Sequence, residues 1–358
     1  MSDTKFAQPV RADKTQYVIG LGIFLLIAVV GLFYAKWNPY YHKAFAVAAS
    51  HTLGASIVSG QANTAPPPSL SAAVSYGLAY FNSIWQALVV GLLLATTIET
   101  LLPRTWLAKL LGSQAFRSTA LGGVIALPGM MCTCCASPVV VGMRKNGVSV
   151  GAALAFWLGN PTLNPATLVF MAFALSWKWA LVRLVIGLVL VFGVSTLVSH
   201  FFVPPDTLDV DFAGLTPDEP ESTGSLVIRW FQTLGKLIVG LIPEYLVIVL
   251  LLGAARAWLF PAASLVAGNS LLTIAGLAIA GTLFVIPTAG EIPIVQTMLH
   301  YGLGVGPAGA LLMTLAPISA PSIAMVWKVF PKRVLAATAL SVAVVGVVSG
   351  VVVLALGF

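Results

Sequence analysis

Apolar runs about as long as a membrane-spanning helix recur from one end of the chain to the other. A helix needs about 20 apolar residues to cross the hydrocarbon core of a bilayer. We therefore predict an all-α polytopic membrane protein with about seven full spans, at 17–35, 82–102, 148–175, 179–203, 237–259, 307–327 and 334–357.

Two further apolar stretches are each interrupted near the middle by prolines. The first, 118–143, contains Pro128, and the second, 270–299, contains Pro287 and Pro293. Proline lacks a backbone N–H and its ring clashes with the preceding turn, so a continuous helix is not expected there. Each stretch is predicted to form a re-entrant helical hairpin, which enters and leaves on one side of the membrane.

An internal repeat relates the two halves of the chain. Residues 84–89 align with 242–247, and 161–165 align with 317–321, where the outer prolines coincide. Each half therefore contains a span, a hairpin, a broken span and a final span. Three crossings per half would make the halves inverted repeats, an arrangement typical of secondary transporters whose substrate site lies where the halves meet.

This organisation divides the chain into four parts. Residues 1–81 are predicted to form an N-terminal anchor helix and an external connection, 82–203 the first repeat, 204–236 a cytoplasmic linker and 237–358 the second repeat. The linker is acidic, since it holds six of the eleven Asp and Glu residues of the chain, namely Asp206, Asp209, Asp211, Asp218, Glu219 and Glu221.

The composition excludes a soluble fold. Hydrophobic residues make up 59% of the chain and charged residues 8%, against about 25% charged residues in soluble domains. The net charge is +7, but the basic residues are scattered. We expect no nucleic-acid partner, because a phosphate-binding surface needs clustered Lys and Arg.

Basic residues in short loops indicate the orientation, because Lys and Arg collect on the cytoplasmic side of a membrane. We expect a multi-pass protein of the cell inner membrane, with a cytoplasmic N-terminus and an uncleaved first helix. This orientation places eight basic loop residues inside: Arg104, Lys109, Arg117, Arg144, Lys145, Lys328, Lys332 and Arg333. Lys36, Lys43 and Lys178 fall outside, against the rule.

The prolines Pro161 and Pro165 should unwind the span that contains them. Unpaired backbone in hydrocarbon is costly, so such a break is expected only where it is buried in protein or lines a polar cavity. A packed proline kink is the alternative. Polar residues at this break and at its counterpart in the second half are candidate substrate ligands: Asn160, Thr162, Asn164, Ser319 and Ser322.

All three cysteines of the chain, Cys132, Cys134 and Cys135, lie at the predicted tip of the first hairpin. Thiolates are the preferred ligands of soft metals and metalloids. The alternatives are core packing and redox chemistry. The CxC and CC spacings disfavour redox chemistry, because both strain a disulfide.

Carboxylates within spans are costly and are by default functional candidates. Glu291, in the second hairpin, is the preferred candidate for proton coupling, and Glu99 and Glu244 are weaker candidates. Arg183 and Arg256 lie near predicted span ends and are expected to snorkel to water.

The chain contains no nucleotide-binding or hydrolase motif. We therefore expect a transporter that is not an enzyme and needs no cofactor. The expected partners are a small-molecule or metalloid substrate and the lipid bilayer, and a homo-oligomer is left open.

The stretch 128–165 resembles the ArsP-type permeases. The resemblance is carried by the CxC with Pro138 four residues later, by Arg144-Lys145-Asn146-Gly147, by 151–156 and by Asn160-Pro161, and in the second half by Pro287-Thr288-Ala289-Gly290-Glu291. It implies a polytopic permease that exports trivalent organoarsenicals, arsenite or antimonite, with Cys132 and Cys134 as metalloid ligands. Cys135 stands where the family usually has glycine.

Two other functions are left open. One is a permease for a sulfur compound or a transition-metal ion, which would use the same thiols. The other is a membrane thiol oxidoreductase.

Overall fold

The computed structural model describes residues 14–60, 62, 64–203, 226–260 and 268–358. Within these ranges the chain is helical and forms no strand beyond the isolated bridge between Ser56 and Gly60. The helices up to residue 202 are α1 (Lys14–Leu32), η1 (Phe33–Trp37), α2 (Asn38–Ser50), α3 (Leu70–Leu101), α4 (Arg104–Leu111), α5 (Phe116–Ala126), η2 (Leu127–Gly129), α6 (Thr133–Lys145), α7 (Val150–Thr162), α8 (Pro165–Ala174), α9 (Trp177–Leu188), η3 (Val189–Val194) and α10 (Ser195–Phe202). Those that follow are α11 (Leu226–Leu259), α12 (Leu271–Leu283), α13 (Glu291–His300), α14 (Val305–Thr314), α15 (Ala320–Val326) and α16 (Lys332–Ala355).

Five helical segments of the described chain are long and apolar enough to cross a membrane. They are Val18–Ser50, Leu70–Leu101, Trp177–Phe202, Leu226–Leu259 and Lys332–Ala355. Each covers one of the predicted spans to within two residues. The all-helical, multi-spanning architecture is therefore confirmed.

The other two predicted spans, 148–175 and 307–327, are each divided into two short helices. In the first, α7 ends at Thr162 and α8 begins at Pro165. In the second, α14 ends at Thr314 and α15 begins at Ala320. Both breaks occur in the proline-containing segments where the sequence predicts them.

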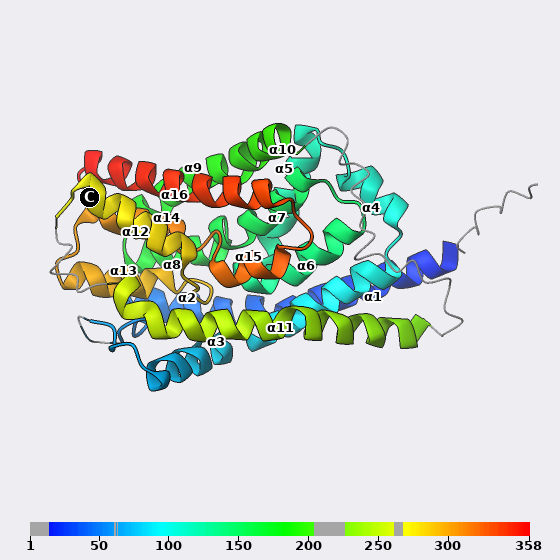
Figure 1. Ribbon diagram of the computed structural model, residues 1–358, viewed down its shortest axis with the longest axis horizontal. Helices are drawn as coiled ribbons and strands as arrows, with labels where there is room; N and C mark the ends of the chain where they lie inside the picture. The colour runs from blue at the N-terminus through cyan, green and yellow to red at the C-terminus, as the bar shows by residue number, and fades with distance from the viewer. Residues whose placement is uncertain (1–13, 61, 63, 204–225, 261–267) are drawn as a thin grey trace, which may run out of the picture.

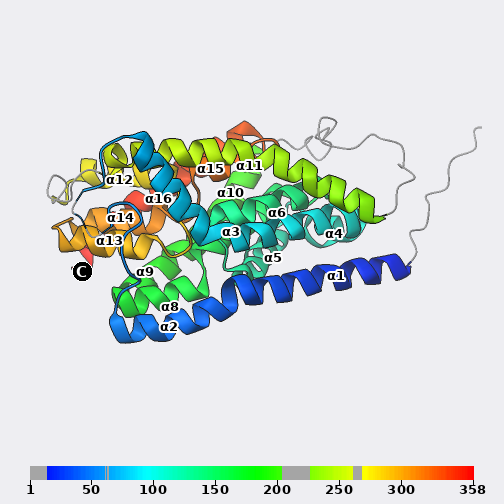
Figure 2. The same ribbon diagram turned by 90° about the horizontal axis from the view of Figure 1, so that it is seen from below.

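The two predicted hairpins are also pairs of short helices, α5 with α6 and α12 with α13. These helices have 10 to 13 residues, or about 15–20 Å, roughly half the thickness of the hydrocarbon core. Figures 1 and 2 show α4, α5 and α6 toward one end of the molecule and α12, α13 and α14 at the other, so the two hairpins extend toward each other from opposite ends.

Helices extend beyond the predicted spans in two regions of the chain. The connection expected after residue 35 is helical as far as Ser50, through η1 and α2, and α3 begins at Leu70 rather than at 82. The expected linker 204–236 is helical from Leu226 onward. Its acidic residues, all within 204–225, lie outside the described residues.

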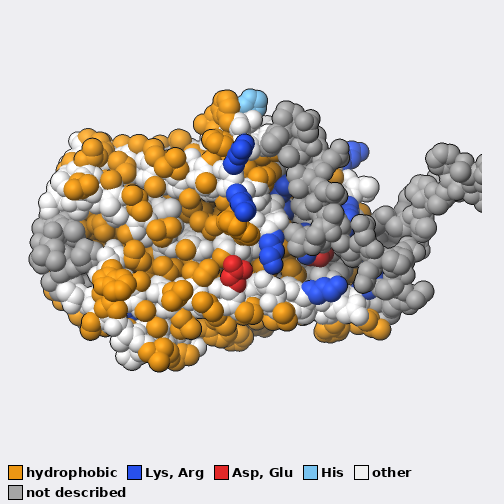
Figure 3. All heavy atoms as spheres, viewed as in Figure 1, with side chains coloured by type: hydrophobic (Ala, Val, Ile, Leu, Met, Phe, Trp, Pro, Cys, Tyr) orange, Lys and Arg blue, Asp and Glu red, His pale blue; other side chains and the backbone are white. Residues whose placement is uncertain are grey.

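Surface composition divides the molecule along its length. In Figure 3 hydrophobic side chains cover most of the visible face, and Lys and Arg side chains gather toward the end of the molecule where α4 and α6 lie. An apolar belt bounded by a cationic end is the surface expected of a protein that sits in a bilayer.

Candidate functional site

The three cysteines lie where the loop of the first hairpin enters α6. Cys132 precedes the first residue of α6, Cys134 and Cys135 belong to its first turn, and all three are buried. Residues three apart on a helix share a face, and the Sγ atoms of Cys132 and Cys135 are 2.7 Å apart. The Sγ of Cys134 lies instead 3.7 Å from the Oγ of Ser319, at the helix break of the second half.

Cys132 and Cys135 therefore form a Cys-x-x-Cys dithiol. The strain expected of CxC and CC disulfides does not apply to this pair, because its spacing is CxxC. A dithiol of this kind can hold a soft, thiophilic centre or exchange with a disulfide. The pair that the resemblance implies, Cys132 with Cys134, stays a prediction.

The cysteine loop is held by residues from two other helices. The backbone N–H of Met131 donates to Asn160 Oδ1 of α7 (3.4 Å), and Trp37 Nε1 of η1 donates to the carbonyl oxygen of Pro128 (2.8 Å). Met130 has a φ of 48°, a left-handed conformation that costs a non-glycine residue about 1–3 kcal/mol. Asn160, a predicted ligand, thus positions the loop.

The break between α7 and α8 leaves two backbone carbonyls without helical partners. Pro165 has no N–H to offer the carbonyl of Pro161, and the N–H of Ala166 is taken by Asn164 Oδ1 at 3.0 Å instead of by the carbonyl of Thr162. Asn164 therefore caps α8. Pro165 itself is exposed, away from the cysteines.

Arg183 of α9 satisfies the freed carbonyls. Its guanidinium donates to Pro161 O (2.9 Å) and Thr162 O (3.1 Å), and also to Leu312 O near the end of α14 (2.8 Å). The C-termini of both half-helices carry partial negative charge, which favours a cation between them. The expectation that Arg183 snorkels to water is wrong, because only 2% of the residue is exposed.

Glu291, at the start of α13, completes this polar cluster. Its carboxylate forms a 2.7 Å ion pair with Arg183, and both side chains are almost fully buried. No described residue donates a hydrogen bond to its Oε2. Glu291 also lines a small pocket together with Cys132 and Pro161, so the predicted coupling carboxylate and one predicted thiol face the same space.

The break in the second half lies against the first hairpin. The N–H of Ser319 donates to Ser322 Oγ (2.9 Å), which caps α15, and Ser137 Oγ of α6 donates to Ser322 O (3.4 Å). The structure thus brings the predicted residues Ser319 and Ser322 next to the cysteine turn.

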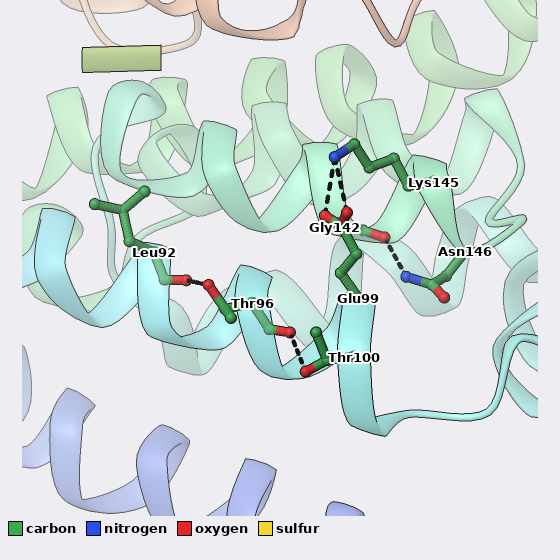
Figure 4. Close-up of polar contacts among 7 residues, drawn as sticks. All are labelled: Leu92, Thr96, Glu99, Thr100, Gly142, Lys145 and Asn146. Atoms are coloured by element: carbon green, nitrogen blue, oxygen red, sulfur yellow. Dashed lines mark hydrogen bonds and ion pairs between the residues drawn. The ribbon is translucent and has the colours of Figure 1, made fainter. Parts of the chain in front are cut away.

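The remaining predicted carboxylates lie outside the cluster. Glu99 forms an ion pair with Lys145 at 2.9 Å, where α3 and α6 end together (Figure 4). Glu244 is exposed on α11. Arg256, expected to snorkel, is buried and donates to Ile57 O at 3.3 Å.

Sequence reasoning missed Lys36. The sequence predicts it in an external loop, but it lies in the π-helical segment η1 and is only 3% exposed. Its Nζ donates to Tyr40 Oη (2.9 Å) and to Thr288 Oγ1 in the loop of the second hairpin (3.0 Å). Lys36 directly follows the apolar run 17–35, where a lysine commonly snorkels to water, so no local signal indicated its burial.

Among the residues that the structure describes, no group of three or more His, Cys, Asp or Glu side chains is arranged to hold a metal ion. The cluster instead combines a dithiol, a buried ion pair and two helix breaks.

Comparison with known proteins supports a transport function. Residues 129–355 match the model of the ArsP_1 family, described as predicted permeases. The chain is 50% identical over 330 residues to the UPF0718 protein YraQ of Escherichia coli, covering 92% of this chain and 93% of that protein. It is 23% identical to the UPF0718 protein MJ0584 of Methanocaldococcus jannaschii, covering 69% and 85%. No solved structure matches. The chain therefore belongs to the ArsP_1 family of predicted permeases.

Proposed function

We propose that this permease captures a soft, thiophilic solute on the Cys132–Cys135 dithiol and exposes it alternately to the two sides of the membrane. The observation that carries the proposal is the placement of two thiols 2.7 Å apart at a hairpin tip, beside helix breaks from both halves of the chain. Broken helices at membrane depth form the substrate sites of many secondary transporters.

The order of elements supports an inverted duplication as the basis of this motion. A long helix, a hairpin, a broken helix and a long C-terminal segment follow one another twice, from α3 to α10 and from α11 to α16. The two hairpins extend from opposite ends of the molecule (Figure 1). Movement of one repeat against the other would open the cysteine loop first to one side and then to the other.

For the solute we propose a trivalent arsenic or antimony species, either an organoarsenical or an inorganic oxyacid. Such centres bind two or three thiolates, and the dithiol supplies two. The resemblance to ArsP-type permeases points to the same class. Cys134 is then available as a third ligand.

A sulfur compound is the second candidate. Lys36 and Lys43 both line a cavity that borders the loop of the second hairpin, and residues 287–289 of that loop also line the pocket of Cys132. Cationic side chains favour an anionic sulfur solute over a neutral arsenical. A thiol oxidoreductase remains a third candidate function, because Cys132 and Cys135 have the CxxC spacing that closes a disulfide readily.

For energy coupling we propose a proton bound at Glu291. In transporters with broken helices the C-terminal ends of half-helices often coordinate Na⁺, whereas here Arg183 fills the space between the ends of α7 and α14. Protonation of Glu291 would weaken its ion pair with Arg183 and so loosen the contact between the two halves.

We propose export from the cytoplasm of the cell that carries this protein in its inner membrane. The cationic end of the molecule, which holds α4 and the end of α6, would face the cytoplasm. The N-terminus would then lie on that side as well.

Transport by the full-length protein in proteoliposomes with an imposed pH gradient tests these proposals. Flux of arsenite, a trivalent organoarsenical, antimonite, thiosulfate and Cu(I) is compared for the wild type and for Cys132→Ser, Cys134→Ser and Cys135→Ser. We expect Cys132→Ser and Cys135→Ser to abolish flux of the true substrate. Absence of flux for every arsenical and for antimonite would exclude the preferred substrate class.

The same vesicles test coupling. Glu291→Gln should remove the dependence of flux on the pH gradient, and Glu99→Gln is the matched control because its carboxylate lies outside the cluster. A Glu291→Gln variant that still responds fully to the gradient would exclude Glu291 as the proton site.

A further inference from the structure

The N-terminal helix contacts the tips of both hairpins, although it precedes the region that matches the family, 129–355. Two consecutive residues of η1 make these contacts: Lys36 donates to Thr288 and Trp37 donates to Pro128. A π-helical turn is rare and occurs frequently at functional sites. Residues 33–37 therefore belong to the site rather than to a peripheral anchor.

Lys36 stands at the inner end of an open cavity of about 550 Å³. The cavity is lined by α2, by α3 and by the loop of the second hairpin, including Tyr40, Lys43, Gln86 and Thr288. Pro287, Thr288 and Ala289 line both this cavity and the small pocket of Cys132 and Glu291. The loop of the second hairpin thus separates an open vestibule from the cysteine site.

The vestibule is cationic. Its lining contains two lysines and, among the described residues, no carboxylate. Lys36 is buried and its two side-chain partners, Tyr40 and Thr288, are both neutral. The other acidic groups that act on its ammonium through space are the thiols of Cys132 and Cys135. Because a buried ammonium is costly without a negative charge nearby, a bound anion would stabilise Lys36 while those thiols are protonated.

The composition of the vestibule indicates which anions fit. Two ammonium groups are strong point-charge donors, and the hydroxyl of Thr288 and the amide of Gln86 add neutral donors. The cavity has room for a multi-atom anion with part of its hydration shell. We propose that this vestibule is a binding site for a small oxyanion or thio-oxyanion, with Lys36 supplying the principal charge and Lys43 a second one at the exposed side.

The site also accounts for two of the three basic residues that contradict the predicted orientation. Lys36 and Lys43 line a cavity instead of lying in a loop, so the positive-inside rule for loops does not apply to them. An anion held at Lys36 would be separated from Cys132 only by the loop around Thr288. That loop holds Ala289 at a φ of 64°, a left-handed conformation that is strained for alanine.

Equilibrium binding of radiolabelled sulfate to the purified full-length protein tests the site. Sulfate is a hard oxyanion that does not bind thiols, so its binding does not report on the dithiol. We expect saturable binding by the wild type, binding about tenfold weaker for Lys36→Gln, equivalent to about 1.4 kcal/mol, and a smaller loss for Lys43→Gln. Lys36→Arg should keep most of the affinity, because it retains the charge.

Lys178→Gln is the matched control. It removes an equal charge from a residue that does not line the vestibule, and its sulfate binding should equal that of the wild type. Equal binding by wild type, Lys36→Gln and Lys178→Gln, or no saturable binding by the wild type, would overturn the proposal. Should Lys36→Gln fail to fold, the other two lysine variants test the site. Weaker sulfate binding by Lys43→Gln with retained binding by Lys36→Arg supports it, and wild-type binding by Lys43→Gln contradicts it.

This proposal and the proposed function fail separately. Cys132→Ser should keep sulfate binding while it loses a thiophilic solute. If the cysteine variants keep both sulfate binding and transport of the thiophilic solute, only the dithiol site is contradicted. If the lysine variants bind sulfate as the wild type does, only the vestibule is contradicted. Competition of thiosulfate with sulfate would show in addition that an anionic thiophile enters the same vestibule.

Discussion

Arg183 and Glu291 form a buried ion pair that joins the two halves of the permease, at 2.7 Å between Nη1 and Oε1. Arg183 belongs to α9 in the first half and Glu291 begins α13 in the second. The same guanidinium binds carbonyl oxygens at the ends of α7 and α14. Both broken helices and one hairpin therefore depend on a single side chain.

Removal of either partner should destabilise the protein strongly. Arg183→Met leaves a buried carboxylate and free carbonyls, and Glu291→Met leaves a buried cation, each at a cost of about 3–5 kcal/mol. The double variant should be less destabilised than the sum of the two, because it leaves no lone charge. Unfolding of the purified protein in detergent measures this cycle, and additive losses would contradict direct coupling.

Trivalent arsenic should bind the pair of cysteines that the structure places together. Phenylarsine oxide, which bridges two thiols, is expected to form an adduct with the wild type and with Cys134→Ser. Cys132→Ser and Cys135→Ser should form none. The intact mass of the protein reports the adduct directly.

The resemblance makes the opposite prediction for two of these variants. If Cys132 and Cys134 are the ligands, Cys135→Ser keeps the adduct and Cys134→Ser loses it. Whichever of Cys134→Ser and Cys135→Ser keeps the adduct therefore identifies the partner of Cys132, and the other variant serves as its control.

Gly91→Ala should displace the cysteine turn. A Cβ at Gly91 of α3 would overlap the carbonyl oxygen of Cys135, which packs directly on this helix. Alanine normally stabilises a helix by about 1 kcal/mol relative to glycine, so the clash should reverse the sign. We expect a lower unfolding temperature and loss of arsenical binding.

Gly240→Ala in α11 is the control for this substitution. A Cβ there meets nothing within 4 Å, so stability should stay the same or rise. Equal behaviour of the two alanine variants would contradict the close packing of α3 on the cysteine turn.

The proposed orientation predicts which introduced thiols can be labelled from each side. In a variant with all three native cysteines replaced by serine, Lys109→Cys and Lys332→Cys should react with an impermeant maleimide only from the cytoplasmic side. Lys178→Cys should react only from the opposite side. Labelling of Lys109→Cys and Lys178→Cys from the same side would contradict the topology.

The sequence predicted the features that depend only on the chemistry of neighbouring residues in the chain. A run of apolar side chains requires burial in lipid or protein whatever surrounds it, so the long helices were predicted close to where they occur. The missing N–H of Pro165 interrupts helical bonding in any environment, so the break after Thr162 was predicted as well. The CxxC spacing of Cys132 and Cys135 is also a local property of the sequence, but only the CxC and CC spacings were considered.

Only the tertiary structure decided the partners of the buried charges. Arg183 and Lys36 lie near the ends of apolar runs, where a long side chain could equally reach water or turn inward. Their contacts with Leu312 and Thr288 join segments separated by 129 and 252 residues, and no local pattern encodes such distances. The burial of a charge is favourable only when the whole fold brings carbonyls, hydroxyls or a carboxylate to meet it, and for that reason the polar cluster at the centre of the permease could not be predicted from the sequence.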